Sequence, residues 1–199
     1  TKIIRNIGCM NGMITTTKYE NLDEVMKRIH AFKVTGVVEQ TTCKESYTIG
    51  TGDKRVALLD YGAKANIAKS LVKRGCQVTV YPASTPASVI LKEKYDGIML
   101  SNGPGDPEEN VQIIEEIKLL ASSQTPIFAI CLGHQLMALA HGFKTEKMKY
   151  GHHGANHPVK DLETGRVYIS TQNHNFVIKE DSIDSAVAKP WFINVNDKT

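Results

Sequence analysis

The 199-residue chain is 41% hydrophobic and carries a formal net charge of +3, and its basic residues are dispersed along the sequence. This composition is sufficient for one substantial core with a smaller appendage, and it indicates neither nucleic acid nor an anionic membrane surface as a partner. No apolar run approaches the roughly 20 residues that span a bilayer. The widely spaced cysteines argue against a zinc site or a disulfide scaffold and favour a reducing, cytoplasmic setting. They are Cys9, Cys43, Cys76 and Cys131.

The first fifty residues differ from the rest of the chain in their pattern of apolar and polar residues. Asn21 has the character of a helix cap, because Glu24 follows at the third position and an apolar face comes after it. Residues 41–53 are rich in Thr, Gly and polar side chains, which is typical of a linker. We therefore expect residues 1–50 to be the C-terminal remnant of a domain whose body lies upstream, ending in this linker.

From residue 54 onward, apolar strands alternate with amphipathic helices. This alternation predicts βαβ units and a three-layer α/β domain over residues 54–199, in which helices flank a mixed, mainly parallel sheet. The predicted strands cover residues 56–60, 77–81, 96–100 and 127–130, and the predicted helices cover residues 63–74, 85–92, a segment from 106 onward, and 132–140. After His141, short β segments are expected at residues 145–149, 167–171 and 186–194.

Cys131 lies where a predicted buried strand meets a predicted helix. Hydrolases often carry their nucleophile at such a strand–turn–helix joint. The small residues Ala129 and Gly133 allow the turn to close, and a helix N-terminus stabilises a thiolate. Taken alone, a cysteine after an apolar strand is more often a buried structural residue. The neighbouring Gly133-His134-Gln135 and a second loop favour the nucleophile.

The second loop is Ser101-Asn-Gly-Pro-Gly-Asp-Pro107, which lies between a predicted strand and a predicted helix. Ligands of α/β sheets bind at this edge. Gly103 and Gly105 let backbone N–H groups approach a ligand, and such donors suit an oxyanion. The loop lacks the Lys-Ser/Thr of a phosphate-binding P-loop and the spacing of a dinucleotide fingerprint. An ordinary Gly/Pro turn is the alternative for the loop alone.

These two motifs together resemble those of the class I glutamine amidotransferases. Two further segments, Tyr150-Gly-His-His-Gly-Ala-Asn-His-Pro-Val159 and Thr171-Gln-Asn-His-Asn-Phe176, narrow the resemblance. Within that family, the chain is similar to the small, glutamine-hydrolysing chains of carbamoyl-phosphate synthetases. The resemblance runs from about residue 54 to residue 199, and the opening segment is similar to the end of the amino-terminal domain of those chains.

The resemblance implies a role for each matching position. Cys131 would attack the carboxamide of glutamine, Leu132 would supply a backbone N–H, and Gln135 would contact the substrate. The other implied substrate-binding residues are Gly103, Gly105, Asn173, Asn175 and Phe176. Two positions depart mildly from the pattern, because Ala129 and Asn175 stand where the family usually has glycine; Asn tolerates a positive φ better than other non-glycine residues.

The family's catalytic base is a histidine followed by Pro-Glu, and this tripeptide does not occur in the 199 residues. We therefore expect the chain alone to hydrolyse glutamine negligibly. His134 is interpreted as a packing residue, and His174 as a residue that shapes the loop around Asn173 or faces a partner chain. His152, His153 and His157 have a spacing that invites a metal site, but the surrounding Gly, Asn and Pro predict a loop without a carboxylate or cysteine nearby. We expect no metal there.

The implied reaction is hydrolysis of glutamine to glutamate and ammonia through a thioester. The resemblance implies no cofactor in this chain; a large partner chain, in a heterodimer or higher assembly, would use ATP and magnesium to make carbamoyl phosphate for arginine and pyrimidine synthesis. One alternative is another class I amidotransferase, such as those of GMP or anthranilate synthesis. The other is a non-catalytic interaction module that keeps the fold and the partner surface.

Overall fold

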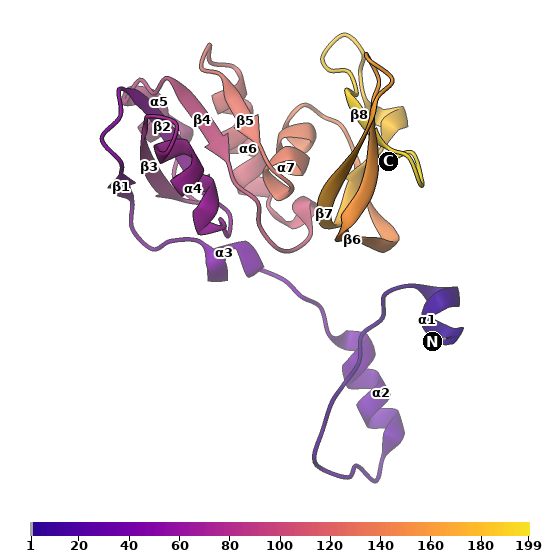
Figure 1. The fold of residues 1–199 in the computed structure, drawn as a ribbon. Helices are drawn as coiled ribbons and strands as arrows, with labels where there is room; N and C mark the ends of the chain where they lie inside the picture. The colour runs from indigo at the N-terminus through magenta and orange to yellow at the C-terminus, as the bar shows by residue number, and fades with distance from the viewer. Residues whose placement is uncertain (1) are drawn as a thin grey trace.

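A computed structural model describes residues 2–199, and its centre is a five-stranded sheet (Figure 1). The strand order is β1-β3-β2-β4-β5, in which β1 is antiparallel to β3 and all other neighbours are parallel. The strands are β1 (Tyr47–Ile49), β2 (Lys54–Asp60), β3 (Cys76–Pro82), β4 (Gly97–Leu100) and β5 (Ile127–Ala129). The four parallel strands are those that the sequence predicted.

Helices cover both faces of this sheet and produce two hydrophobic clusters. On one face, Leu59 and Leu100 pack against the three helices α5 (Ala87–Lys92), α6 (Val111–Ala121) and α7 (Leu132–Ala140). On the other face, Leu58 and Met99 pack with the single helix α4 (Ala65–Val72). Adjacent strand residues point to opposite faces, so both sides of β2 are buried, as expected for a parallel sheet. The predicted three-layer α/β class is confirmed.

A second sheet lies beside α7 and contains β6 (Thr145–Asp161), β7 (Val167–Ile178) and β8 (Phe192–Asn194). Its order is β7-β6-β8, and both pairings are antiparallel, with register shifts between Lys147 and His152 and between Gly154 and His157. The expectation of a loop around the three histidines is wrong, because residues 145–161 form one irregular strand. The expected strand at residues 186–194 shrinks to β8.

The N-terminal helices are α1 (Lys2–Ile7), α2 (Leu22–Ala31) and α3 (Val37–Thr41). In Figure 1, α1 and α2 lie apart from the main sheet, and α3 lies at its border. The side chain of Asn21 accepts hydrogen bonds from the amides of Asp23 and Glu24, which confirms the predicted cap. Leu22 on the apolar face of α2 is exposed.

The segment expected to be a linker is partly structured. Within residues 41–53, β1 pairs with β3, and just before this segment Val38 in α3 is buried within the main core. The polar residues of β1 had indicated a linker, but pairing with a neighbouring strand satisfies their backbone groups. The ordered unit therefore begins before residue 54.

Two short 3-10 helices complete the chain, η1 (Pro107–Glu109) and η2 (Glu180–Ser182). The helix predicted to begin at Asp106 begins as η1, where the Asp106 side chain accepts a hydrogen bond from the amide of Glu108. Asn110 then separates η1 from α6. In the part of the chain that the structure describes, no helix is both long and apolar enough to cross a membrane.

Candidate active site

Cys131 stands at the tight turn between β5 and α7. Its backbone has φ 52° and ψ −110°, so it is one of three non-glycine residues with positive φ among residues 2–199. Such strain clusters at functional sites and is a feature of nucleophile turns. A Cβ atom at Gly133 would lie 2.6 Å from the carbonyl oxygen of Leu100, so only glycine lets α7 approach β4 this closely. The predicted strand–turn–helix arrangement around Cys131 is present, and its role as nucleophile stays a prediction.

The electrostatic surroundings of the Cys131 thiol differ from the expectation. Burial raises its pKa above the ordinary cysteine value, while a hydrogen bond from the Leu132 amide and the charge of Lys64 lower it by less. The expected stabilisation of the thiolate by the helix N-terminus is therefore outweighed by desolvation in the unliganded protein. The Sγ atom lies 3.9 Å from the carbonyl oxygen of Asn173 on β7.

The glycine loop after β4 is held rigidly beside this turn. Ser101 is fully buried, and its hydroxyl accepts a hydrogen bond from the Tyr61 amide at 2.9 Å and donates to the Asn102 carbonyl at 2.8 Å. The side-chain oxygen of Asn102 accepts from the amide of Lys64 at 3.0 Å. These bonds tie the loop to the ends of β2 and α4, which meet at the carboxyl edge of the sheet.

The two glycines predicted to line the site have different neighbours. A Cβ atom at Gly103 would lie 2.1 Å from the Tyr61 carbonyl oxygen and 2.7 Å from the Leu132 side chain. Gly103 is thus packed against the residue that follows Cys131. Gly105 has φ +94°, and a Cβ atom there would meet Val37 of α3 at 2.6 Å. The structure brings Gly103 to the turn and places Gly105 against α3.

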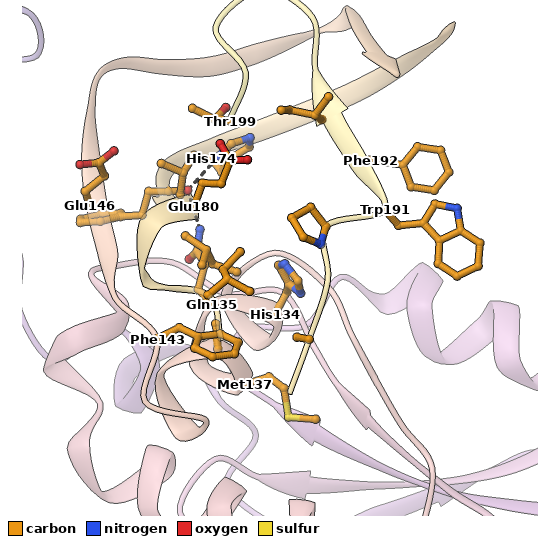
Figure 2. A pocket seen from close by; sticks show the side chains of 18 of the residues that line it. His134, Gln135, Met137, Phe143, Glu146, His174, Glu180, Trp191, Phe192 and Thr199 are labelled. Atoms are coloured by element: carbon orange, nitrogen blue, oxygen red, sulfur yellow. Dashed lines mark hydrogen bonds between the residues drawn. The ribbon is translucent and has the colours of Figure 1, made fainter. Parts of the chain in front are cut away.

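A cavity of about 930 Å³ opens between α7, β7 and the C-terminal segment (Figure 2). Cys131, Gln135 and Phe176 line it together, and the roles expected for them stay predictions. The buried Gln135 side chain donates a hydrogen bond from Nε2 to the Phe176 carbonyl oxygen at 2.7 Å. This bond fixes α7 against β7 within the cavity wall.

Alternation along β7 divides the predicted residues between two faces. Gln172, His174 and Phe176 line the cavity, whereas the side chains of Asn173 and Asn175 are exposed on the opposite face. There the ring nitrogens of His153 lie 2.9 Å from Asn173 Oδ1 and 3.1 Å from Asn175 Oδ1. Asn173 contacts Cys131 only through its carbonyl group, and Asn175 does not adopt the positive φ that was considered for it.

Several cavity residues were not predicted as site residues from the sequence. His134, interpreted as a packing residue, lines the cavity beside Cys131, and so do Trp191, Asp197 and Thr199 from the C-terminal segment. His134 could have been found from its place three residues after Cys131, whereas no local signal marked the other three. Among residues 2–199, no cluster of three or more His, Cys, Asp or Glu side chains is arranged to hold a metal ion.

A mainly parallel sheet with a strand–cysteine–helix turn at its carboxyl edge and a glycine loop beside it defines a class of α/β domain. The glutamine amidotransferase class-I family matches residues 57–199, and the chain belongs to this family. It is 46% identical over 178 residues to the carbamoyl phosphate synthase small chain of Clostridium perfringens, and 44% identical over 201 residues to that of Listeria monocytogenes.

These alignments cover 89% and 100% of the chain but 50% and 54% of the relatives, so the chain spans about half the length of the curated relatives that it matches. Among solved structures, a glutamine amidotransferase of Thermotoga maritima superposes with a TM-score of 0.51 at 16% identity, over 63% of this chain and 62% of that one. At this identity the likeness shows the fold alone.

Proposed function

We propose that the chain is the Cys131-bearing part of the glutaminase component of a carbamoyl-phosphate synthetase; because no His-Pro-Glu occurs in these 199 residues, we expect the chain alone to hydrolyse glutamine negligibly. The observation that carries the proposal is the placement of Cys131, which has a strained backbone at a helix N-terminus and lines a cavity with Gln135 and Phe176. The similarity to curated small chains of carbamoyl phosphate synthase supports this choice within the amidotransferase family.

In the proposed reaction, the Cys131 thiolate attacks the side-chain carbonyl carbon of glutamine. The carbonyl oxygen becomes an oxyanion, which in this proposal the Leu132 amide and the backbone beside Gly103 stabilise. Collapse of this intermediate breaks the C–N bond, and ammonia leaves after its nitrogen has received a proton from the histidine of the family's His-Pro-Glu, a tripeptide that these 199 residues do not contain. Water then attacks the thioester, which releases glutamate and regenerates the thiol. Burial of the thiol in the free protein means that substrate binding has to favour the thiolate.

The proposal assigns the later steps to a partner. Ammonia would pass to a large synthetase chain, which would use ATP and magnesium to form carbamoyl phosphate for arginine and pyrimidine synthesis, in a heterodimer or a higher assembly. Support comes from the small-chain relatives, whose description implies a larger counterpart. The four free thiols of the chain support a reducing, cytoplasmic setting.

The function is tested by trapping Cys131 with a diazoketone analogue of glutamine, followed by mass mapping of the modified residue. We expect labelling at Cys131 that excess glutamine suppresses, that Cys131→Ser abolishes and that the control Cys9→Ser leaves unchanged. Ammonia release would be measured in parallel, with and without a large synthetase chain. The proposal would be contradicted if excess glutamine did not suppress the labelling, or if the label fell mainly on Cys9, Cys43 or Cys76.

A non-catalytic interaction module is the second candidate. It is supported by the net increase in the pKa of Cys131, which disfavours the nucleophilic form of the thiol. This candidate predicts that the chain binds the large synthetase chain while Cys131 stays unlabelled by the analogue. Size-exclusion chromatography of the mixed chains, run beside the trapping assay, distinguishes the two functions.

A further inference from the structure

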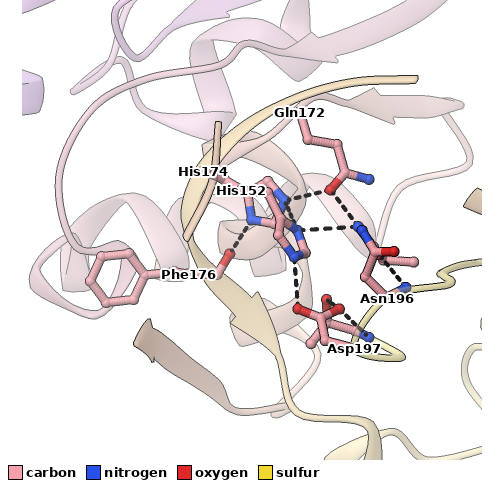
Figure 3. Close-up of polar contacts among 8 residues, drawn as sticks. His152, Gln172, His174, Phe176, Asn196 and Asp197 are labelled. Carbon is pink, nitrogen blue, oxygen red and sulfur yellow. Dashed lines mark hydrogen bonds and ion pairs between the residues drawn. The ribbon is translucent and has the colours of Figure 1, made fainter. Parts of the chain in front are cut away.

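Both sheets contribute contacts that hold the candidate site in place. In the second sheet, His174 Nδ1 lies 2.9 Å from the carbonyl oxygen of Phe176, a residue of the cavity wall (Figure 3). In the main sheet, the glycine loop packs against the turn of residues 61–64, which joins β2 to α4. The side chain that shapes this turn belongs to Asp60, the last residue of β2, which does not itself line the cavity.

The carboxylate of Asp60 accepts three backbone hydrogen bonds. Oδ1 accepts from the amides of Gly62 at 2.9 Å and Ala63 at 2.6 Å, and Oδ2 accepts from the amide of Cys43 at 2.8 Å. Asp60 is only 8% exposed, and a buried carboxylate is costly unless such bonds compensate for its lost hydration. Because the two Oδ1 partners follow two and three residues later, the side chain fixes the turn directly, and Oδ2 ties that turn to the segment before β1.

The turn shaped by Asp60 is enclosed between the glycine loop and α3. The Tyr61 carbonyl oxygen approaches Gly103 so closely that a Cβ atom there would lie 2.1 Å from it. Gly62 has φ +111°, and a Cβ atom at Gly62 would lie 2.9 Å from the Pro104 ring and 3.0 Å from Thr41 Oγ1. The packing leaves no free space between these segments, so a displacement of the turn has to displace the glycine loop.

Hydrogen bonds continue from the turn through the glycine loop to α7. The amide of Tyr61 donates to Ser101 Oγ at 2.9 Å, and Asn102 Nδ2 donates to the Gly62 carbonyl oxygen at 3.3 Å. The Ser101 carbonyl oxygen accepts from the amide of Gly133 at 3.0 Å. Gly133 lies in the first turn of α7, so the geometry set at the end of β2 reaches the residues that follow the candidate nucleophile.

We propose that Asp60 is a positioning residue of the glutaminase site, which holds the turn of residues 61–64 and thereby places the backbone beside Gly103 next to the Leu132 amide. This inference rests on the proposed function, because that function gives these two backbone groups their role as oxyanion donors. Such donors stabilise a developing charge only when they are fixed in advance. Loss of the side chain that shapes the turn should therefore slow the chemical step and leave substrate binding by the rest of the cavity largely unchanged.

Asp161 provides a matched control, because it shapes the same kind of turn outside the cavity. It is 7% exposed, and its Oδ1 accepts from the amides of Glu163 at 2.9 Å and Thr164 at 3.2 Å, again two and three residues later. Asp161 is not among the residues that line the cavity. Asp60→Ala and Asp161→Ala therefore remove equivalent bonds, and the melting temperature should fall in both variants.

The probe is the diazoketone analogue of glutamine, with the limiting rate of Cys131 labelling measured separately from the half-saturating concentration. We expect Asp60→Ala to lower the limiting rate about tenfold while the half-saturating concentration stays within about twofold of the wild type. Asp161→Ala should change neither quantity. Unfolding of part of the sample reduces the fraction of protein that is labelled but not the rate constant of the folded fraction, so the limiting rate reports on the position of the loop.

A conservative variant and the wild-type protein provide tests that do not require Asp60→Ala to fold. Asp60→Asn keeps an acceptor for the amides of Gly62 and Ala63, so it should retain at least about a third of the wild-type limiting rate. In the wild-type protein, these two amides should exchange slowly with solvent. Rapid exchange of both amides, or a limiting rate in Asp60→Asn as low as about a tenth of the wild type, would overturn the inference.

Backbone amide signals separate the inference from the function on which it rests. Asp60→Ala should shift the amide signals of Gly103 and Leu132, and Asp161→Ala should not. If the wild-type chain is not labelled by the analogue, the proposed function fails, and these shifts still decide whether Asp60 positions the loop. If the wild-type chain is labelled but Asp60→Ala matches Asp161→Ala in limiting rate and in amide signals, the positioning role fails and the glutaminase assignment stands.

Discussion

The side chain of Gln135 and the carbonyl of Phe176 are joined by a 2.7 Å hydrogen bond that connects the nucleophile helix to the second sheet. The Phe176 carbonyl also accepts from His174, so this single oxygen receives donors from both sides of the cavity wall. Gln135 is buried, so its amide has little access to water. The bond therefore contributes both to stability and to the shape of the candidate site.

Replacement of Gln135 by leucine should destabilise the protein by about 1–2 kcal/mol, because one donor is lost while the carbonyl keeps its histidine partner. Urea unfolding measures the change. Gln112→Leu on the exposed face of α6 serves as the control and should stay within about 0.5 kcal/mol of the wild type. Equal stability of the two variants would show that the Gln135 bond contributes nothing net.

The rate of Cys131 alkylation should increase with pH across the neutral range, because burial holds the thiol in its protonated form and only the thiolate reacts. Lys64→Met should slow the reaction roughly two- to fivefold at neutral pH, since the lysine charge lowers the thiol pKa and its loss raises that pKa further. Mass mapping after brief alkylation measures the rate for each cysteine.

The exposed Lys69, farther along α4, provides the matched control, and Lys69→Met should leave the Cys131 rate unchanged. The effect of Lys64 should shrink at high salt, because Lys64 is exposed and its field is screened. A rate that is independent of pH would indicate that burial does not control this thiol.

Gly103→Ala should cost about 1–3 kcal/mol of folding free energy, because the new methyl group would overlap the Tyr61 carbonyl and displace Leu132. The variant should also lose labelling by the glutamine analogue, since Leu132 adjoins the nucleophile. Gly12→Ala, where no atom lies within 4 Å of the added carbon, is the neutral comparison. Wild-type stability in Gly103→Ala would mean that the loop shifts freely.

Ser101→Ala should destabilise the protein by about 1–3 kcal/mol, because it leaves the amide of Tyr61 without its acceptor in a fully buried position. Thermal unfolding of this variant is compared with that of Ser70→Ala, which alters an exposed serine on α4. If both variants melt alike, a rearranged backbone or a water molecule has taken over the hydroxyl's role.

The sequence predicted the secondary structure correctly where neighbouring residues in the chain determine it. The apolar run before Cys131 and the glycine after it predicted the nucleophile turn, and α7 begins and ends where its apolar spacing indicated. Around His152, the abundance of Gly, Asn and Pro predicted a loop. Those residues form a strand because they pair with β7, whose residues follow many positions later in the chain. Non-local pairing of this kind leaves no pattern in a short window of sequence.

The same distinction applies to the chemistry of the site. The identity of the candidate nucleophile followed from residues 126–135, but the direction of its pKa shift depends on burial, which no neighbouring residue reveals. Likewise, Asn173 and Asn175 share a motif with Phe176, yet strand geometry sends the two asparagine side chains to the opposite face. The shared motif predicted that these residues lie near the candidate site, but it did not predict the direction in which their side chains point.

Because the side chains of β7 point alternately to the two faces of the second sheet, the number of residues in this strand cannot change freely. A deletion of one residue between Val167 and Gln172 would invert the faces of the strand and bring the asparagines to the cavity in place of His174 and Phe176. Substitutions do not change which positions of β7 face the cavity, whereas insertions or deletions of a single residue do. Length variation among related proteins should therefore concentrate in the turn between β6 and β7, outside the paired residues, or occur in steps of two.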